Sequence, residues 1–182
     1  MSDQYWQYLA GLDSEMLERL MADYGQEVWN YAFFVTKNKS LADDITQDVF
    51  LQAYRSFSSF RGEASMRTWL LKITRNKSIN SVRSAFVRRV LLVDIVRPGG
   101  KASSAENDYI AREAANEVWR SVLELPIKHR EVIILHARYE LSTEQMAGVL
   151  QIPEGTVKSR LHAARRRLSA LLQKEELLHE SF

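Results

Sequence analysis

The sequence STEQMAGVLQIPEGTVKSRLHAARRRL at residues 142–168 predicts two short helices joined by a tight turn. Ser142 and Gln145 have the spacing of a capping box, in which each side chain bonds the backbone N–H of the other residue. The run QIP at residues 151–153 interrupts the first helix, and we expect the second helix to begin near Thr156. Because the second helix is basic, the pair has the form of a helix-turn-helix, which places its second helix in the major groove of DNA.

The second helix of this motif is expected to have a buried face and a DNA-reading face. Its apolar residues recur at intervals of three and four, which is the spacing of a buried stripe. They are Val157, Leu161, Ala164, Leu168 and Leu171. Lys and Arg bond guanine edges or phosphates, and Ser bonds either, so the polar residues are candidate contacts to duplex DNA. They are Thr156, Lys158, Ser159, His162, Arg165 and Arg166. The alternative is a helical hairpin with a solvated basic face.

The same helical spacing continues through most of the chain and predicts an all-α fold. We expect a first helix after a cap at Ser14, a second after a capping box of Ser40 and Asp43, and a third from about Ser65 to Arg89. The buried stripe of the first helix is Leu17, Leu20, Tyr24, Val28, Ala32 and Val35. That of the second helix is Ile45, Val49, Ala53 and Phe57.

A break in composition separates these helices from the helix-turn-helix. The segment RPGGKASS at residues 97–104 is rich in glycine and small polar residues, so we expect a flexible linker at residues 91–111. Two small helical domains follow, residues 14–90 and 112–182, with an N-terminal extension at residues 1–13. Within the second domain, Pro126 is expected to separate helices at about 113–125 and 128–140.

The composition excludes several functional classes. The 182 residues include no cysteine, so the chain has neither a disulfide nor a thiolate metal site. No apolar run approaches the roughly 20 residues of a membrane span, and the first residues lack a signal-peptide pattern, so we expect a soluble, cytoplasmic protein. We also expect no cofactor, no metal and no catalytic residue. The chain has no phosphate-binding glycine loop and no nucleophile paired with a base, and the adjacent Asp43 and Asp44 should face different directions.

The basic residues are concentrated in two places, although the net charge is only +2. Residues 1–60 carry four basic and nine acidic side chains, whereas residues 61–101 carry ten basic and two acidic ones. A second basic patch lies at residues 155–173, which contain no acidic side chain. Two separated basic surfaces indicate a polyanion that is contacted at two places, although a charge run is more often a solvated helix face.

The first basic block contains a stripe of aromatic, amide and cationic residues on one face of the third helix. The stripe is Trp69, Lys72, Asn76, Asn80 and Arg83, and the loop before it contributes Phe60, Arg61 and Ser65. Aromatic rings stack on unpaired bases while cations and amides hold the adjoining backbone, so this surface is typical of single-stranded nucleic-acid binding. The alternative is that Trp69 packs in the core and that the cations are ordinary surface charges.

These motifs resemble those of a known family. The segments LADDITQDVFLQAYR at 41–55 and FRGEASMRTWL at 60–70, with Arg75-Asn76, resemble region 2 of bacterial sigma factors of the extracytoplasmic-function (ECF) group, group 4 of the sigma-70 family. Leu125-Pro126, HREVI at 129–133, Leu141-Ser142 and GTVKSRLH at 155–162 resemble their region 4. The resemblance runs from about Leu17 to Leu172, in the order of the family.

The resemblance implies a promoter-specificity subunit of RNA polymerase that has no catalytic activity of its own. Region 2 would bind the clamp coiled coil of the largest polymerase subunit through its second helix, and region 4 would contact the flap of the second-largest subunit. The outward face of that second helix is Asp44, Gln47, Asp48, Leu51 and Arg55. An acidic and amide face with one leucine suits a basic, partly apolar partner.

Contacts to promoter DNA and to an inhibitor are implied in the same way. Region 2 of the family opens the −10 element and captures a flipped base beside the loop before the third helix, and region 4 reads the −35 element as duplex. Family members are often held inactive by an anti-sigma factor that is commonly anchored in the membrane, with no membrane insertion of the sigma factor itself.

This sequence also departs from the family pattern. Ala163 and Ala164 stand where long polar side chains are common, and Lys77 and Ser78 replace apolar residues or alanine. The rival interpretation is a stand-alone DNA-binding regulator with the same helix-turn-helix, which would bind a two-fold symmetric operator without polymerase.

Overall fold

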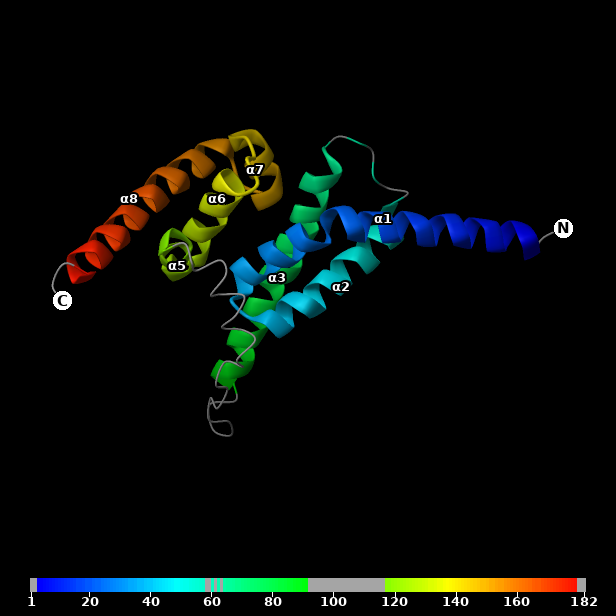
Figure 1. The fold of residues 1–182 in the computed structure, drawn as a ribbon, viewed down its shortest axis with the longest axis horizontal. Coiled ribbons are helices and arrows are strands. Elements are labelled where there is room, and N and C mark those ends of the chain that lie inside the picture. Colours follow the sequence, from blue (N-terminus) through cyan, green and yellow to red (C-terminus); the bar gives the residue numbers. More distant parts are fainter. Residues whose placement is uncertain (1–2, 58–59, 61, 63, 92–116, 180–182) are drawn as a thin grey trace. The chain divides into compact units, whose positions relative to one another are not determined.

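The computed structural model describes residues 3–57, 60, 62, 64–91 and 117–179, and within these ranges the regular structure is helical (Figure 1). The helices are α1 (Asp3–Thr36), α2 (Lys39–Ser56), α3 (Met66–Leu91), α5 (Glu117–Glu124), α6 (Ile127–Ala137), α7 (Thr143–Leu150) and α8 (Glu154–His179). No strand occurs in these ranges, which confirms the predicted all-α fold. None of the helices in the described ranges is long and apolar enough to span a membrane.

The chain divides into two compact units, residues 1–81 and 82–182. The division falls inside α3, whereas the sequence predicts a boundary in the linker at residues 91–111. Residues 92–111 of that linker lie outside the described part of the chain. The domain boundaries therefore stay predictions, while the presence of two compact helical units agrees with the expected organisation.

The first unit is built on the pair α1 and α2, which a two-residue connection joins. Lys37 adopts a left-handed backbone with φ 56°, and its N–H donates to the carbonyl of Phe33 at 2.7 Å, which ends α1. Asn38 is extended and caps α2, because its side-chain oxygen accepts a hydrogen bond from Leu41 N at 3.0 Å. So short a connection makes the two helices neighbours that pack along their lengths.

The predicted caps of α1 and α2 are both wrong. Ser14 lies inside α1, which already begins at Asp3. Gly11 does not interrupt this helix, because a single glycine is tolerated within a helix. Ser40 lies in the first turn of α2, because Asn38 two residues earlier already supplies the cap. The carboxylate of Asp43, which the capping box would have used, instead accepts a hydrogen bond from Trp29 Nε1 at 2.6 Å.

The core of the first unit contains most of the predicted stripes. The six predicted residues of α1 are buried or half-buried, as are those of α2, with Phe57 half-buried at the end of α2. Several large core residues lie outside the predicted stripes, namely Tyr31, Phe34 and Phe50. Tyr31 and Phe34 were missed because residues 30–35 of α1 are all buried, so the apolar residues there extend beyond a single stripe. Phe50 belongs to α2, where it lies next to the predicted core residue Val49.

The start of α3 is fastened to α1. Ser65 Oγ accepts a hydrogen bond from Thr68 N at 3.1 Å, which agrees with the predicted start near Ser65. Arg67 on the first turn of α3 donates to both carboxylate oxygens of Glu27 on α1, at 2.6 and 2.8 Å. A bidentate arginine–carboxylate pair constrains the relative orientation of the two side chains as well as the distance between them. This pair therefore sets the position of the first turn of α3 relative to α1.

In the second unit, α5 and α6 are joined at Pro126, as predicted. Residues 113–116 of the predicted first helix lie outside the described part of the chain, and α5 ends at Glu124. α6 ends at Ala137 rather than at the predicted Glu140, because Glu140 adopts a left-handed backbone with φ 55°. The chain then folds back, and Leu141 N donates to the carbonyl of Leu135 at 3.0 Å.

The helix-turn-helix is present as α7 and α8. The capping box of Ser142 and Gln145 is confirmed, with both of its hydrogen bonds formed. Gln151 ends α7 in a left-handed conformation with φ 54°. α8 begins at Glu154, two residues before the predicted Thr156, because the carbonyl of Pro153 already accepts hydrogen bonds from Thr156 N and Val157 N.

Candidate nucleic-acid and protein-binding surfaces

The apolar and the polar residues of α8 lie on different faces of the helix, as predicted. Val157, Leu161 and Ala164 are buried, and Leu168 and Leu171 are half-buried against the rest of the second unit. The candidate DNA-reading residues Lys158, Ser159, His162, Arg165 and Arg166 are exposed, and Thr156 is half-buried. α8 therefore presents a largely basic and polar surface, interrupted by alanines such as the half-buried Ala163 and the exposed Ala170, and such a surface suits a duplex groove. The DNA-reading roles of its residues stay predictions.

Lys158 is held by a neighbour that the sequence reasoning missed. Its ammonium Nζ lies 2.7 Å from Oε1 of Glu154, one helical turn earlier. The same Oε1 accepts a hydrogen bond from Thr143 Oγ1 on α7, also at 2.7 Å. The hydrogen bonds from Lys158 and Thr143 lower the pKa of the Glu154 carboxyl, so it is ionised at neutral pH. The pair spacing of Glu154 and Lys158 was visible in the sequence, whereas the contact with Thr143 was not.

Arg165 and Arg166 differ in what surrounds them. Arg165 Nη2 lies 2.8 Å from Nε2 of His136, a residue in the last turn of α6. Since a guanidinium only donates hydrogen bonds, the imidazole nitrogen is the acceptor in this contact. Within the described residues, the Arg166 guanidinium has no ion pair or hydrogen bond. Arg166 is therefore the cation of this face that is most available to a ligand.

The structure brings together the two aromatic residues predicted to stack on unpaired bases. The rings of Phe60 and Trp69 lie 5.0 Å apart between centroids, and Phe57 lies 6.4 Å from Phe60. Trp69 is half-buried, so part of its side chain packs within the protein and part is exposed for stacking on a base. Lys72, Asn80 and Arg83 are exposed and Asn76 is half-buried along α3. Arg61 lies outside the described residues, and the Ser65 hydroxyl is 2.9 Å from Thr68 Oγ1.

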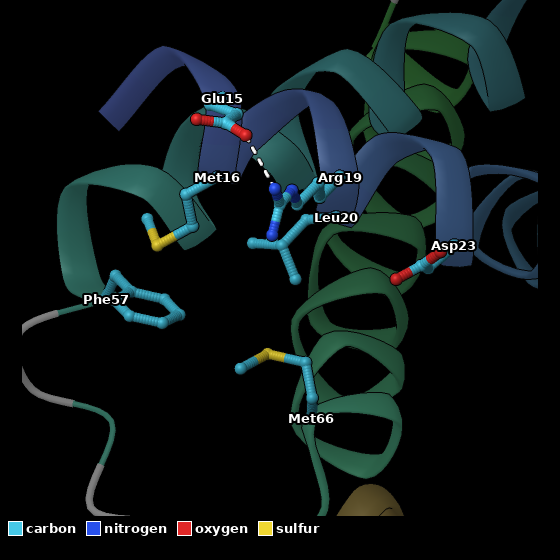
Figure 2. A pocket seen from close by; sticks show the side chains of 7 residues that line it. All are labelled: Glu15, Met16, Arg19, Leu20, Asp23, Phe57 and Met66. Atoms are coloured by element: carbon cyan, nitrogen blue, oxygen red, sulfur yellow. Dashed lines mark hydrogen bonds and ion pairs between the residues drawn. The ribbon is translucent and has the colours of Figure 1, made fainter. Parts of the chain in front are cut away.

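A pocket of about 410 Å³ lies where the loop before α3 leaves α2 and joins α3. Figure 2 shows four apolar side chains around it, from Met16, Leu20, Phe57 and Met66. The charged side chains of Glu15, Arg19 and Asp23 line it too, and Arg19 is paired with Glu15 at 2.6 Å. An apolar pocket with a charged edge, near the aromatic rings of Phe60 and Trp69, is suited to a flat ring with polar edges.

A second pocket of about 340 Å³ lies in the other unit, between the α5–α6 junction and α8. Its lining is mostly apolar, from Leu125, Pro126, Ala170 and Leu171, with Arg167 and Glu124 as charged members. The sequence reasoning did not single out these residues as a surface.

The predicted docking face of α2 is exposed. Asp44, Gln47, Asp48, Leu51 and Arg55 all reach solvent, and 49% of Leu51 is exposed. Tyr54, with 38% exposed, belongs to the same face and was missed, because an aromatic residue is by default assigned to the core. An acidic face that leaves two apolar side chains in water is typical of a surface that binds another protein.

One of the departures from the family pattern contacts this face. Lys77 on α3 pairs with Asp48 on α2, with 3.2 Å between Nζ and Oδ2. Ser78 beside it is fully buried. Asp43 and Asp44 are both exposed, and of the two Asp43 bonds the indole of Trp29 on α1. Among the described side chains, no group of three His, Cys, Asp or Glu is placed to hold a metal ion.

Comparison with known proteins adds independent information. Residues 20–86 match the model of Sigma-70 region 2, and residues 115–168 match that of Sigma-70, region 4. RNA polymerase sigma factor YlaC of Bacillus subtilis (strain 168) is 32% identical over 164 residues, which cover 88% of this chain and 94% of YlaC. ECF RNA polymerase sigma-E factor of Escherichia coli (strain K12) is 33% identical over 140 residues, covering 71% of this chain and 73% of that protein.

A solved structure shows the same fold. The sigma factor RpoE from Bartonella quintana, in complex with the anti-sigma factor NepR, superposes with a TM-score of 0.69 and 21% identity. The match covers 86% of this chain and 96% of RpoE. With two region matches in the family's order and relatives aligned over most of their length, the chain belongs to the ECF sigma factors of the sigma-70 family, which direct bacterial RNA polymerase to promoters.

Proposed function

We propose that this sigma factor binds core RNA polymerase through α2 and contacts promoter DNA at two separate places. Residues 60–83 hold the unpaired −10 element, and the exposed face of α8 reads the −35 element as duplex. The observation that supports the proposal is that the aromatic pair Phe60 and Trp69, beside the exposed cation Lys72, and the exposed basic face of α8 belong to different compact units. The proposal assigns promoter selection to this chain and RNA synthesis to the polymerase.

Charge and exposure support docking on the polymerase. The α2 face offers Asp44 and Asp48 as acidic groups and Leu51 and Tyr54 as apolar ones. Such a face matches a basic, partly apolar partner, and we propose that this partner is the clamp coiled coil of the largest subunit. In the second unit, we propose that the apolar pocket lined by Leu125 and Leu171 receives part of the flap of the second-largest subunit.

The pocket beside the loop before α3 is where we propose that an unpaired −10 base is held. Two methionines and a phenylalanine line it, and thioether and aromatic groups both make favourable contacts with a flat ring. Extruding a base costs a few kcal/mol of stacking and pairing, and stacking on aromatic side chains returns about 1–3 kcal/mol per base. Phe60 and Trp69 supply a second such contact next to the pocket.

Replacing Trp69 by alanine should slow promoter opening more than it slows formation of the closed complex. The substitution removes the ring that packs against Phe60 and that we expect to stack on a base. Permanganate footprinting of unpaired thymines measures opening, and a filter-binding assay measures the closed complex. The control is Trp69→Phe, which keeps an aromatic ring and should retain most of the opening. Normal permanganate reactivity with Trp69→Ala would show that the residue is only a packing element.

Replacing Arg166 by alanine should weaken −35-dependent transcription by about 1–3 kcal/mol, the usual cost of losing a specific base contact. Arg166 is exposed and has no ion pair in the described residues, so it can reach the groove without breaking an existing bond. The measurement is transcription in vitro from a promoter with an intact −35 element and from one with that element scrambled. Lys174→Ala, an exposed cation nearer the end of α8, is the matched control. An equal loss on both promoters would make Arg166 a phosphate contact.

We also propose that an anti-sigma factor controls this protein. RpoE, which shares its fold, was crystallised with the anti-sigma factor NepR. The exposed acidic and apolar face of α2 is a surface that such a partner would need to cover to block polymerase binding. A competition assay tests this step. The anti-sigma factor and core polymerase should compete for the wild-type chain, and substitutions on the exposed face of α2 should weaken binding of the anti-sigma factor.

The experiment that tests the proposed function is transcription in vitro from fragmented genomic DNA of the source bacterium. Core RNA polymerase is supplied with and without this protein, and the transcript starts are mapped. Discrete new starts that share −35 and −10 elements are expected. Specific binding of the protein alone to a two-fold symmetric duplex, with no protein-dependent start, would instead favour a stand-alone regulator.

A further inference from the structure

The first residue of α8 is a carboxylate that directly precedes residues 155–173, a stretch with basic but no acidic side chains. Glu154 is exposed, and its position matters because the N-terminal residues of a recognition helix are the ones that contact base edges. Thr143 and Lys158 both bond to Oε1, at 2.7 Å each. Within the described residues, the second oxygen, Oε2, has no partner. Glu154 thus combines one anchored oxygen with one that is open to a ligand.

The chemistry of a carboxylate limits which ligand this open oxygen can accept. Phosphates repel it, so Glu154 gains nothing from the DNA backbone and can gain only from a hydrogen-bond donor on a base edge. In the major groove, cytosine offers its N4 amino group, and guanine offers only the acceptors O6 and N7. Adenine offers an amino group beside the acceptor N7, which a carboxylate with no proton cannot satisfy. Cytosine is therefore the base that fits.

The two neighbours of Glu154 hold it in place for such a contact. Thr143 belongs to α7 and Lys158 to the next turn of α8, so the carboxylate is fixed from both helices of the motif. A fixed side chain loses little further rotamer freedom on binding. The hydrogen bonds from Lys158 and Thr143 also keep the carboxyl ionised, and an ionised carboxyl only accepts hydrogen bonds.

We propose that Glu154 is a specificity-determining residue that reads one cytosine of the −35 duplex through Oε2, and that Thr143 and Lys158 are its positioning residues. The inference rests on the proposed function, because it requires α8 to enter the groove of the −35 element. Glu154 adds one acidic residue to the DNA-reading surface of α8, whose other charged residues are basic. Lys158 would then orient the Glu154 carboxylate in addition to contacting the DNA.

The test is transcription in vitro by the complete holoenzyme from a promoter library in which every −35 position carries each of the four bases. Wild-type protein should prefer cytosine at one position by about tenfold, the scale of one good base contact. Glu154→Gln should abolish that preference or transfer it to adenine, because a carboxamide can both donate and accept. Thr143→Val removes the anchoring hydrogen bond while keeping the shape, and should weaken the cytosine preference without changing the preferred base.

The outcomes separate this inference from the proposed function. If wild-type protein shows strong −35 preferences and Glu154→Gln leaves every one of them unchanged, the reading role is wrong. A uniform fall across all sequences with Glu154→Gln would overturn it too, because it would mark Glu154 as a structural link between α7 and α8. If wild-type protein shows no dependence on the −35 sequence at all, the proposed function of α8 fails, and the inference fails with it.

Discussion

Replacing Asp48 by arginine is expected to weaken binding of this protein to core RNA polymerase by about tenfold or more. Asp48 lies at the centre of the exposed α2 face, with Asp44 one turn before it and Leu51 one turn after it. Reversing its charge would place two like charges together in the complex, which costs up to several kcal/mol. The measurement is the Kd of the full chain for core polymerase at two salt concentrations, because screening should reduce the difference at high salt.

The ion pair between Asp48 and Lys77 requires its own control. Asp48→Arg also removes that pair and sets two cations against each other, which could disturb the packing of α3 on α2. Lys77→Gln breaks the same pair but leaves the acidic charge of the α2 face in place, so it should bind core polymerase at least as well as wild type. Glu18→Arg reverses an exposed charge on α1 and should have little effect. Wild-type affinity in Asp48→Arg would place the docking surface elsewhere.

Replacing Arg130 by methionine should lower the free energy of unfolding of the second unit by about 3 kcal/mol. Arg130 is 5% exposed, and its Nη1 donates to the carbonyls of Leu123 at 2.9 Å and Leu125 at 3.3 Å. Burial lowers the pKa of Arg130 to about 10, which still leaves the guanidinium charged at neutral pH. Without it, carbonyls at the end of α5 lose a charged donor, and each such hydrogen bond contributes about 1.5–3 kcal/mol.

Hydrogen exchange of the complete chain measures this effect locally. Amides of α5, α6 and α8 should exchange faster in Arg130→Met, while those of α1 and α2 should keep their protection, because they belong to the other unit. Arg120→Met, an exposed arginine on α5, is the matched control. Protection equal to wild type in Arg130→Met would mean that the two carbonyls find other donors, and that Arg130 is not the residue that holds α5 to α6.

The sequence was sufficient to predict the helices and the buried face of α8, because these depend on local spacing. It predicted one of three helix caps. Ser142 was identified because the complete capping box lies in four consecutive residues. At the start of α2 the sequence pattern predicted Ser40, whereas Asn38 supplies the cap, because the left-handed backbone of Lys37 ends α1 directly before it, and the local residue pattern does not reveal that backbone. The start of α8 was placed two residues late for a related reason, since Pro153 and Glu154 already belong to its first turn.

The candidate site was predicted less completely, because its interactions join residues that are distant in the sequence. The contacts Trp29–Asp43, Lys77–Asp48 and His136–Arg165 span 14, 29 and 29 residues. Periodicity identifies which face a residue occupies, but it cannot identify which neighbour from another helix meets it there. The pocket beside the loop before α3 is an extreme case, because its lining comes from the first three helices.

The ends of the loop before α3 are each fixed by contacts that lie in the helices themselves. At one end Phe57 closes α2 through its N–H to Tyr54, and at the other Arg67 is clamped to Glu27. Within the segment between them, the ring of Phe60 packs 5.0 Å from that of Trp69, and Gly62 holds a left-handed backbone with φ 71°. These two positions are therefore constrained, while the flanking helices are fastened independently. Under the proposed function, a substitution near Phe60 and Gly62 that keeps these two residues should change the contacts to the −10 element while the Arg67–Glu27 pair between α3 and α1 stays in place. Under the proposed function, this separation of fastened helices from the connecting segment would let −10 preference diversify on one helical scaffold.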